Sequence, residues 1–560
     1  MHLPPGLKRA LPFLRWPRPT RSSFRQDAWA GVSVGLVLVP QAVAYATLAG
    51  MPAETGLYAA LLPAIVGILW GSSGLLAVGP VALTSLLTFG SLSSLATPGS
   101  ATWVGLAIWL SLYSGIMQFA LGAFRLGRIA NLVSQPVMAG FINAAAIIII
   151  FSQLPALLGL ANPDAAGVAE FASRMSSDPL AAVMPAAFGC GALVFLLAVK
   201  RLFPALPGVL LITIIGIAAS MVIDYEGLGG KVVGTIVAGL PPLMLPPSIP
   251  LASHQELWPA ALVVALISFT EAMSSCRVIA QKKNVSWDEN QELIGQGLAK
   301  IASGVSGAFP VSGSFSRSAL NLYAGATSGW STLIATLCVL VSLLFLTDLI
   351  HYLPRSILAA MVIVPVLSLI NFSVFGRLYR LSKTDGAIAV VTFLVTLMSM
   401  PRLHWGVVAG VGLTMASYLY RRSDPRIVEV GMHEDGTLRD RSRFDLPPLA
   451  DDLLAARIDA ALNFLTAPAL ERYIMEYVKA NPRVRRVLLC SNGINSIDTT
   501  GMDALERLHL TLAGDGIELY LSAVKKQVWD MLERSHLPGA MGPGHVFATD
   551  AEAVAGLTKP

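Results

Sequence analysis

Long apolar runs separated by short polar segments make up most of the chain between Ala28 and Tyr420. A helix that crosses a membrane needs about 20 mostly apolar residues. Three runs, 75–95, 290–307 and 310–325, are short or interrupted by Gly and Pro; with these included, the pattern predicts fourteen spans. The clear candidates are 30–49, 56–70, 102–122, 134–159, 180–199, 205–223, 257–275, 328–349, 354–374, 384–400 and 403–420.

The distribution of Lys and Arg predicts the orientation of these spans, because short cytoplasmic loops are enriched in basic residues. The segment 1–26 is basic and is expected to be cytoplasmic, without a cleavable signal. Every second loop after it is also basic, as an even number of spans requires, so both termini are expected to be cytoplasmic. These loops carry Arg125/Arg128, Lys200/Arg201, Arg277/Lys282/Lys283, Arg377/Arg380/Lys383 and Arg421/Arg422.

After Arg422 the pattern changes to short strand-like and helix-like runs, which predicts a small α/β domain. We therefore expect a transmembrane domain over 27–422 and a cytoplasmic domain over 423–560. Within the second domain the predicted strands are 426–430, 485–490 and 517–523, and the predicted helices are 500–512 and 526–535.

Composition agrees with a chain that lies in a bilayer. Hydrophobic residues make up 54% of it, charged residues 13%, and the mean hydropathy is +0.65, which together exclude an ordinary soluble globular protein. The four cysteines lack the spacing of a disulfide framework or a zinc site. No Walker loop, nucleophile–base arrangement or metal-ligand cluster is found, so we expect no enzyme activity. The net charge of +5 is explained by the loops and indicates no nucleic-acid partner.

Two of the interrupted runs correspond to each other. Both 76–85 and 308–318 consist of a few extended residues, a Gly, and then the start of a helix, opened by Pro80 or capped by Ser314. Gly79 and Gly313 are 234 positions apart, and Gln41 and Glu271 are 230 positions apart. This near-constant offset predicts two seven-span halves of inverted topology, with a binding site at the broken spans.

Two helix N-termini that meet at the membrane midplane would form an anion site. Each has unpaired amides and a partial positive charge of about half a unit. Arg317 adds a full charge and is expected to face a cavity, since a lone Arg costs about 3 kcal/mol in a membrane helix. The alternative is that Arg317 extends to the cytoplasmic interface. Candidate hydroxyl donors are Thr84, Ser85, Ser312, Ser314, Ser316 and Ser318.

Glu271 lies inside an apolar run, and a carboxyl group at membrane depth suggests function. When protonated it is a neutral hydrogen-bonding group; when ionised it can hold Na⁺ or pair with Arg317. Either form would couple cation binding to the anion site. The alternative is a fixed structural Glu271–Arg317 pair.

The segments 27–32, 40–46, 48–52 and 56–58 resemble the opening motif of the SulP sulfate-permease family, and 309–318 is similar to the family's tenth span. The C-terminal domain resembles a STAS domain. The resemblance implies a uracil-permease-like fold, with a core of spans 1–4 and 8–11 and a gate of spans 5–7 and 12–14. It also implies elevator-type movement and a homodimer. The resemblance implies that the substrate site is lined by Gln41, Tyr45, Glu271 and the two half-helix starts, Gly79, Pro80, Val81, Ala82, Gly313, Ser314, Phe315, Ser316 and Arg317. The residues that we expect to couple a cation are Glu271 and Ser275.

The stretch 496–501 resembles the STAS loop in which a hydroxyl residue near a helix start is phosphorylated in soluble relatives. Here the candidate residues are Thr499 and Thr500. A phosphate would suit that helix N-terminus, but an Asp/Thr cap of a strand-to-helix turn explains the same residues. The STAS domain is more often a structural or regulatory contact, and it could bind a cytoplasmic partner.

These features predict secondary active transport of a small oxyanion across the inner membrane, nominally sulfate, with H⁺ or Na⁺ as the coupling ion and no other cofactor. Bicarbonate and C4-dicarboxylates are alternative substrates. An uncoupled anion channel is a rival function. A membrane-anchored regulator that acts through its STAS domain is another rival.

Overall fold

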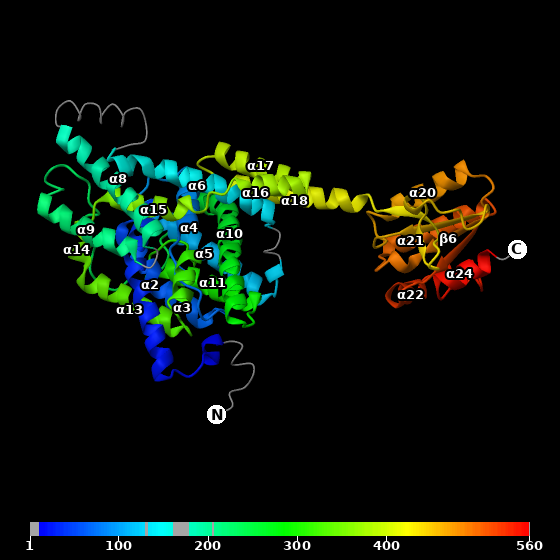
Figure 1. Ribbon diagram of the computed structural model, residues 1–560, viewed down its shortest axis with the longest axis horizontal. Helices are drawn as coiled ribbons and strands as arrows, with labels where there is room; N and C mark the ends of the chain where they lie inside the picture. Colours follow the sequence, from blue (N-terminus) through cyan, green and yellow to red (C-terminus); the bar gives the residue numbers. More distant parts are fainter. Residues whose placement is uncertain (1–10, 129–132, 161–178, 204–205, 559–560) are drawn as a thin grey trace. The chain divides into compact units, whose positions relative to one another are not determined.

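The computed structural model describes residues 11–128, 133–160, 179–203 and 206–558 (Figure 1). Contacts divide the chain into two compact units, with the division between Thr414 and Met415. The predicted domain boundary lies a few residues later, near the end of the helix α18, which runs across this division. Of the expected N-terminal segment, residues 1–10 lie outside the described part of the chain.

The first unit is built almost wholly from helices. Within the residues just given, six helices of this unit are long and apolar enough to cross a membrane: α2, α3, α5, α6, α10 and residues 183–202 of α8. The helices of this unit are η1 (Pro12–Arg15), α2 (Arg21–Leu48), α3 (Ala53–Trp70), α4 (Ala82–Leu92), α5 (Ala101–Ala123), α6 (Gln135–Leu158), α8 (Pro179–Leu202), α9 (Gly208–Ile223), α10 (Leu251–Lys283), α11 (Glu289–Val305), α12 (Phe315–Tyr323), α13 (Trp330–Phe345), α14 (Thr347–His351), α15 (Arg355–Leu367), α16 (Ser373–Leu381), α17 (Lys383–Met398) and α18 (His404–Ser423).

Each predicted span contains one of these helices, but some bounds differ. The predicted span 328–349 is divided into α13 and α14 at Leu346. The predicted span 354–374 is too long, because α15 ends at Leu367 and the separate helix α16 follows. The spans 75–95 and 310–325 hold only the short helices α4 and α12. The number of fourteen crossings stays a prediction.

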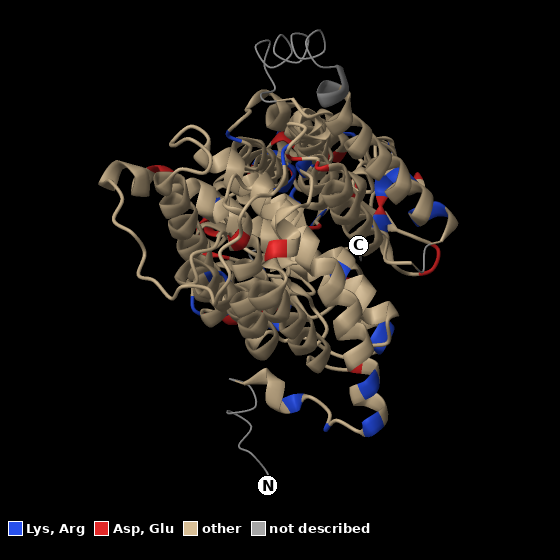
Figure 2. Ribbon diagram, turned by 90° about the vertical axis from the view of Figure 1, so that its left-hand side faces the viewer, with Lys and Arg blue, Asp and Glu red and all other residues tan. Residues whose placement is uncertain are grey.

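Helices from the two halves of the unit pack closely together. α11 lies along both α5 and α3, and α2 lies along α13, as Figure 1 shows for the blue and green segments. Glycines permit the close approach: a Cβ on Gly115 of α5 would lie 2.8 Å from the carbonyl oxygen of Gly297, and one on Gly31 would lie 2.4 Å from that of Ser331. Small residues play this part in membrane helix packing generally. In Figure 2 most of the ribbon carries no charge, and basic residues recur where the N-terminal segment enters α2.

The second unit contains a six-stranded sheet in the order β4-β3-β5-β6-β7-β8, with strands β5 to β8 parallel. All three predicted strands and both predicted helices are present, whereas β5 and α20 were not predicted. Its elements are β3 (Ile427–Met432), β4 (Leu438–Asp440), α19 (Arg441–Phe444), β5 (Leu453–Ile458), α20 (Ala467–Ala480), β6 (Arg486–Cys490), η3 (Ser491–Gly493), α21 (Thr499–Gly514), β7 (Glu518–Ser522), α22 (Lys526–Leu532), α23 (Leu537–Met541), β8 (Val546–Phe547) and α24 (Asp550–Leu557).

Candidate functional site

Two short strands bring the interrupted runs together. β1 (Val78–Gly79) and β2 (Ser312–Gly313) pair antiparallel, with Val78 opposite Gly313 and Gly79 opposite Ser312. The Ser314 amide also donates to the carbonyl oxygen of Ala77 at 2.8 Å. Each strand leads directly into a helix, α4 after β1 and α12 after β2. The two helix starts are therefore neighbours although they are far apart in sequence.

The two helix starts are completed differently. The Ser314 side chain caps α12 by accepting a hydrogen bond from the Arg317 amide at 3.3 Å, so the predicted cap is confirmed. α4 begins at Ala82 after Val81, and no side chain caps it. Pro80 lies before the cap position and not in the first helical turn, so that part of the prediction is wrong.

Arg317 is buried inside the unit, with only 1% of its surface exposed. One guanidinium nitrogen, Nη1, donates to the carbonyl oxygen of Pro80 at 2.9 Å, and Nη2 lies against Gly79. Nε and Nη2 have no hydrogen-bond partner. Beside the guanidinium there is a void of about 10 Å³, bordered by Val78 and Asn321. A side chain enclosed in this way does not extend to the cytoplasmic interface.

Gln41 and Tyr45, which lie one turn apart on α2, are also buried, at 5% and 4% exposure. The Gln41 side-chain oxygen has no hydrogen-bond partner, and neither has the Ser85 hydroxyl of α4. The Tyr45 phenol interacts electrostatically with Arg317 and with Glu271. Buried polar atoms without partners are uncommon in proteins, and three of them, Arg317 Nε, Arg317 Nη2 and Ser85 Oγ, belong to the first turns of the two helices.

Glu271 of α10 is half-buried as a residue, but its carboxyl oxygen Oε2 is fully buried and has no hydrogen-bond partner. The carboxyl group interacts electrostatically with Arg317 and with Lys300. Ser275, predicted to assist in cation coupling, donates its hydroxyl to the backbone oxygen of Glu271 at 3.3 Å. Its hydroxyl therefore bonds within the helix and not to the carboxylate.

The remaining predicted positions differ in exposure. Phe315 and Ser316 are exposed, whereas Gly79, Val81, Ala82 and Gly313 are buried. Three predicted hydroxyl donors bond to backbone groups: Thr84 to Val81, Ser312 to Ser268, and Ser318 as acceptor from Ala77. The Ser314 and Ser316 hydroxyls are 3.4 Å apart. Among the predicted hydroxyl residues that are buried, Ser85 is the one left without a partner within the described residues.

Lys300 was missed by the sequence analysis. It lies in α11 with no exposed surface, and its ammonium group interacts electrostatically with Glu271. Its Nζ donates to the side-chain oxygen of Gln118, on α5, at 2.7 Å. The sequence could have indicated it, because Lys300 is a charged residue within the predicted span 290–307, and a charge at membrane depth suggests function. Its partners are distant in sequence and could not be identified without the fold.

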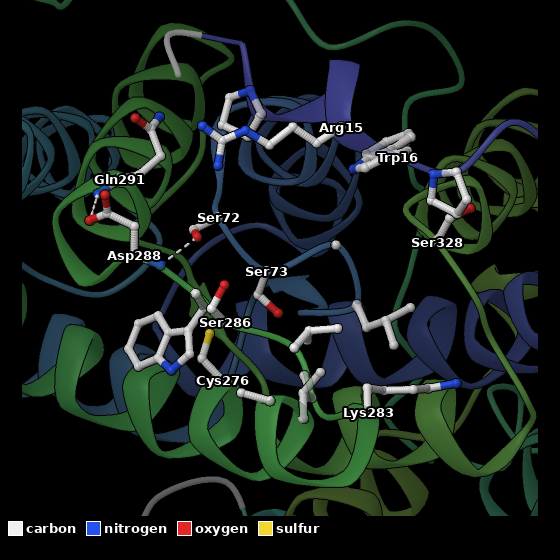
Figure 3. A pocket seen from close by; sticks show the side chains of 18 of the residues that line it. Arg15, Trp16, Ser72, Ser73, Cys276, Lys283, Ser286, Asp288, Gln291 and Ser328 are labelled. Atoms are coloured by element: carbon white, nitrogen blue, oxygen red, sulfur yellow. Dashed lines mark hydrogen bonds between the residues drawn. The ribbon is translucent and has the colours of Figure 1, made fainter. Parts of the chain in front are cut away.

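A larger cavity, of about 480 Å³, lies elsewhere in the first unit and contains none of the predicted site residues. Figure 3 shows Arg15 and Trp16 of the N-terminal segment on one side of it and Lys283 of α10 on another. On its wall the Asp288 amide donates to the Ser72 hydroxyl at 2.7 Å. These contacts fasten the loop between α3 and β1 to the start of α11.

In the second unit, Thr499 and Thr500 are the first two residues of α21 and both are exposed. Asp498 caps this helix, its side chain accepting from the Gly501 amide at 2.7 Å. The residues fit both a cap and an accessible hydroxyl site. Across the ranges that the structure describes, no group of three or more His, Cys, Asp or Glu is arranged to hold a metal ion.

Comparison with known proteins decides the family. Residues 24–392 match the model of the sulfate permease family, and residues 448–553 match the model of the STAS domain. The chain belongs to the sulfate permease family. Sulfate transporter 4.1, chloroplastic, of Arabidopsis thaliana is 30% identical over 99% of this chain and 83% of its own length. A Mycobacterium tuberculosis protein named a probable sulfate transporter is 30% identical over 95% of both chains.

Solved structures agree on the fold. The murine Solute Carrier 26 member A9 anion transporter, in the inward-facing state, has a TM-score of 0.88 at 21% identity, covering 99% of this chain and 95% of that one. The transmembrane domain of the cyanobacterial bicarbonate transporter BicA has a TM-score of 0.60 at 20% identity, covering 70% and 99%. The predicted fold class, a helical membrane protein of inverted repeats with a STAS domain, is confirmed.

Membership of the sulfate permease family makes this chain a multi-pass membrane protein and an anion transporter. The family consists of transporters, so the prediction that the chain is not an enzyme is confirmed. The STAS domain places the second unit in a fold of helices on a sheet, as observed.

Proposed function

We propose that this sulfate permease family member carries a small oxyanion, with sulfate as the first candidate, by secondary active transport. Its relatives in Arabidopsis thaliana and Mycobacterium tuberculosis carry names of sulfate transporters, whereas the BicA title names bicarbonate. The transport takes place across the cell inner membrane with both termini in the cytoplasm, as the alternation of basic loops supports.

The observation that carries the proposal is the set of unsatisfied groups around the paired broken helices. Arg317 has two guanidinium nitrogens without partners, and α4 begins without a side-chain cap. Each buried polar group left unpaired costs about 1–3 kcal/mol. A bound oxyanion supplies the acceptors that these donors lack, and the helix N-termini and the guanidinium both favour its charge. Gln41 and Tyr45 border the same place.

Glu271 provides the coupling. When protonated, its carboxyl group is neutral and leaves the positive charge of Arg317 for the anion. When ionised, it competes with the anion for that charge. Proton binding at Glu271 therefore promotes anion binding, and loss of the proton promotes release. Sodium held by the ionised carboxylate is the alternative coupling ion.

The packing supports a moving core and a separate gate. α2, α3, α5, α11 and α13 pack on one another, and α6 packs on α8, α15 and α17. The broken helices α4 and α12 both contact α2 of the first group, so the site would travel with the core in an elevator movement. A homodimer would hold the gates fixed against each other in the membrane. The STAS domain would act as a regulatory contact, with Thr499 or Thr500 as its candidate phosphorylation site.

Radiolabelled uptake into proteoliposomes tests the function. Sulfate, bicarbonate, fumarate and chloride are each supplied with an imposed H⁺ gradient, an imposed Na⁺ gradient, or neither. We expect an inward H⁺ gradient to accelerate sulfate uptake, and unlabelled sulfate inside the vesicles to stimulate entry of the label. Absence of this trans-stimulation would identify a channel. A second experiment compares, in cells, a variant that lacks residues 426–560 with the variant Glu271→Gln. If the deletion abolishes the cellular phenotype of the protein and Glu271→Gln leaves it intact, the protein is a regulator and not a transporter.

A further inference from the structure

Lys300 and Arg317 are the two cationic residues that are almost fully buried in the described part of the first unit. The function proposed above gives a role to Arg317 and none to Lys300. Its Nζ donates to the Gln118 side-chain oxygen at 2.7 Å. Gln118 is held in turn, because its amide nitrogen donates to the Ala265 carbonyl oxygen at 2.7 Å and to the Ser268 hydroxyl at 3.3 Å. Ser268 lies one helical turn before Glu271 on α10. The hydrogen bonds thus link the ammonium to the helix that carries the coupling carboxylate.

The packing of α5 on α11 fixes Lys300 in place. A Cβ on Gly115 would lie 2.9 Å from the Lys300 Cβ, and a Cβ on Gly304 would lie 2.8 Å from the Leu112 side chain. The Ser111 hydroxyl donates to the Lys300 backbone oxygen at 2.8 Å. With no exposed surface and this tight fit, the side chain cannot extend to water as an interfacial Lys does. A buried ammonium in such surroundings needs a negative or polar partner.

Lys300 interacts directly with one titratable group, Glu271, and two further helices supply the groups that act on Glu271. α10 supplies Glu271, with which Lys300 interacts electrostatically. α12 supplies Arg317 and α2 supplies Tyr45, which both interact with Glu271. On α11 itself, Glu292 faces away, since its carboxylate accepts from the Ser72 and Ser73 amides. α5 offers Lys300 only the neutral Gln118 and Ser111 among the described contacts.

We propose that Lys300 sets the charge of the anion that this transporter prefers. The inference rests on the proposed function and deepens it. Hydrogen bonds connect Lys300 through Gln118 to Ser268, whose backbone oxygen accepts from the Ser312 hydroxyl of β2. Lys300 and Arg317, when charged, each act on Glu271, and Glu271 offsets one of these two positive charges when it is ionised. The protonated cluster therefore matches a divalent anion, and the ionised cluster matches a monovalent one. Lys300 acts on the anion through the field at Glu271 and Arg317, without touching it.

The test measures sulfate and chloride uptake by the full-length protein in proteoliposomes at two external pH values. Lys300→Met removes the charge at nearly constant volume. Gln118→Glu keeps Lys300 but pairs it with a carboxylate, which cancels the charge by a different route. We expect each variant to lower the sulfate-to-chloride uptake ratio about tenfold or more, as loss of a buried charge nearby requires. Ser111→Ala is the matched control, because it disturbs the same helix contact without changing any charge.

The outcomes separate the inference from the proposed function. An unchanged ratio and pH profile in both charge variants overturns the inference, and so does an equal loss of the ratio in Ser111→Ala. If Lys300→Met fails to fold, the isosteric Gln118→Glu decides alone. A wild-type protein that takes up none of the anions contradicts the proposed function itself, whatever the variants do.

Discussion

The two broken helices share a backbone plan but differ in the side chains that complete it. β1 leads into α4 through Pro80 and Val81, and no side chain caps the helix. β2 leads into α12 through Ser314, which caps it, and Arg317 follows in the first turn. The repeat thus provides two sets of helix amides but only one guanidinium. The inverted halves are alike in geometry and unlike in charge.

Exposure separates the two regions further. The start of α4 is buried, whereas Phe315 and Ser316 at the start of α12 are exposed. Arg317 crosses from the second region to the first, where it bonds to the Pro80 carbonyl oxygen at 2.9 Å. From this comparison we expect α12 to be the side that receives the substrate and α4 to support it. Removing a group from α12 should therefore do more harm than a comparable change at α4.

The largest effect is expected for Arg317→Ala. It removes the only cation of the two helix starts, so the KM for the transported anion should rise by tenfold or more. The measurement is concentration-dependent uptake in proteoliposomes. Arg402→Ala is the matched control, because Arg402 is an exposed basic residue before α18. Equal effects of the two substitutions would contradict the assignment of the site to α12.

Glu271→Gln should abolish the dependence of uptake on external pH. In the wild-type protein, uptake should rise as the pH falls, since protonation removes the negative charge that competes with the anion. Glutamine is neutral at every pH and imitates the protonated form, so the profile should become flat. Uptake recorded over a pH series, with and without Na⁺, provides the check. A variant that keeps the wild-type response to both ions would show that coupling lies elsewhere.

Gly79→Ala tests the supporting role of the first region. A Cβ at this position would lie 3.2 Å from Arg317 Nη2, so the guanidinium must shift by a few tenths of an ångström. We expect a KM increase of about two- to fivefold, smaller than that of Arg317→Ala. Gly412→Ala is the control, since a Cβ there meets no atom within 4 Å. A KM equal to that of the wild type would mean that the guanidinium position is not critical.

The smallest effect is expected for Ser314→Ala, which removes the cap of α12. Loss of such a cap lowers the stability by about 1 kcal/mol, and thermal unfolding in detergent should show a slightly lower Tm. Ser316→Ala removes a hydroxyl 3.4 Å from that of Ser314 but leaves the cap itself, so it should lower the Tm by less. If the two variants have the same Tm, the Ser314–Arg317 hydrogen bond does not stabilise this region.

The broken helices could be predicted because their signal is local. Gly and Pro interrupt two apolar runs, and the similar offsets of Gly79 to Gly313 and of Gln41 to Glu271, 234 and 230 positions, indicate the repeat. The pairing register, by contrast, depends on how two distant segments meet. The bond from Arg317 to the Pro80 carbonyl oxygen could not be predicted from the sequence. Nor could the bonds by which the Thr84 and Ser312 hydroxyls donate to backbone oxygens.

Other elements were missed for identifiable reasons. Lys300 stood in a run already weakened by glycines, and its partner Gln118 comes from another helix. Strand β5 carries a run, Leu453–Ile458, that is buried on both faces and shows little alternation. Pro468 suggests the end of a helix in the sequence, but in the structure it lies in the first turn of α20, where Pro is well tolerated. In each of these cases the structure depends on tertiary contacts that the local sequence does not contain.

The antiparallel pairing of Val78–Gly79 with Ser312–Gly313 has a mechanical consequence. Its main-chain hydrogen bonds join the two halves of the transmembrane unit at the place where both helices are interrupted. If one half-helix moved alone, these hydrogen bonds would break and leave backbone amides unpaired within the membrane, which is costly. In the transport cycle proposed above, both half-helices would therefore move together as one rigid piece.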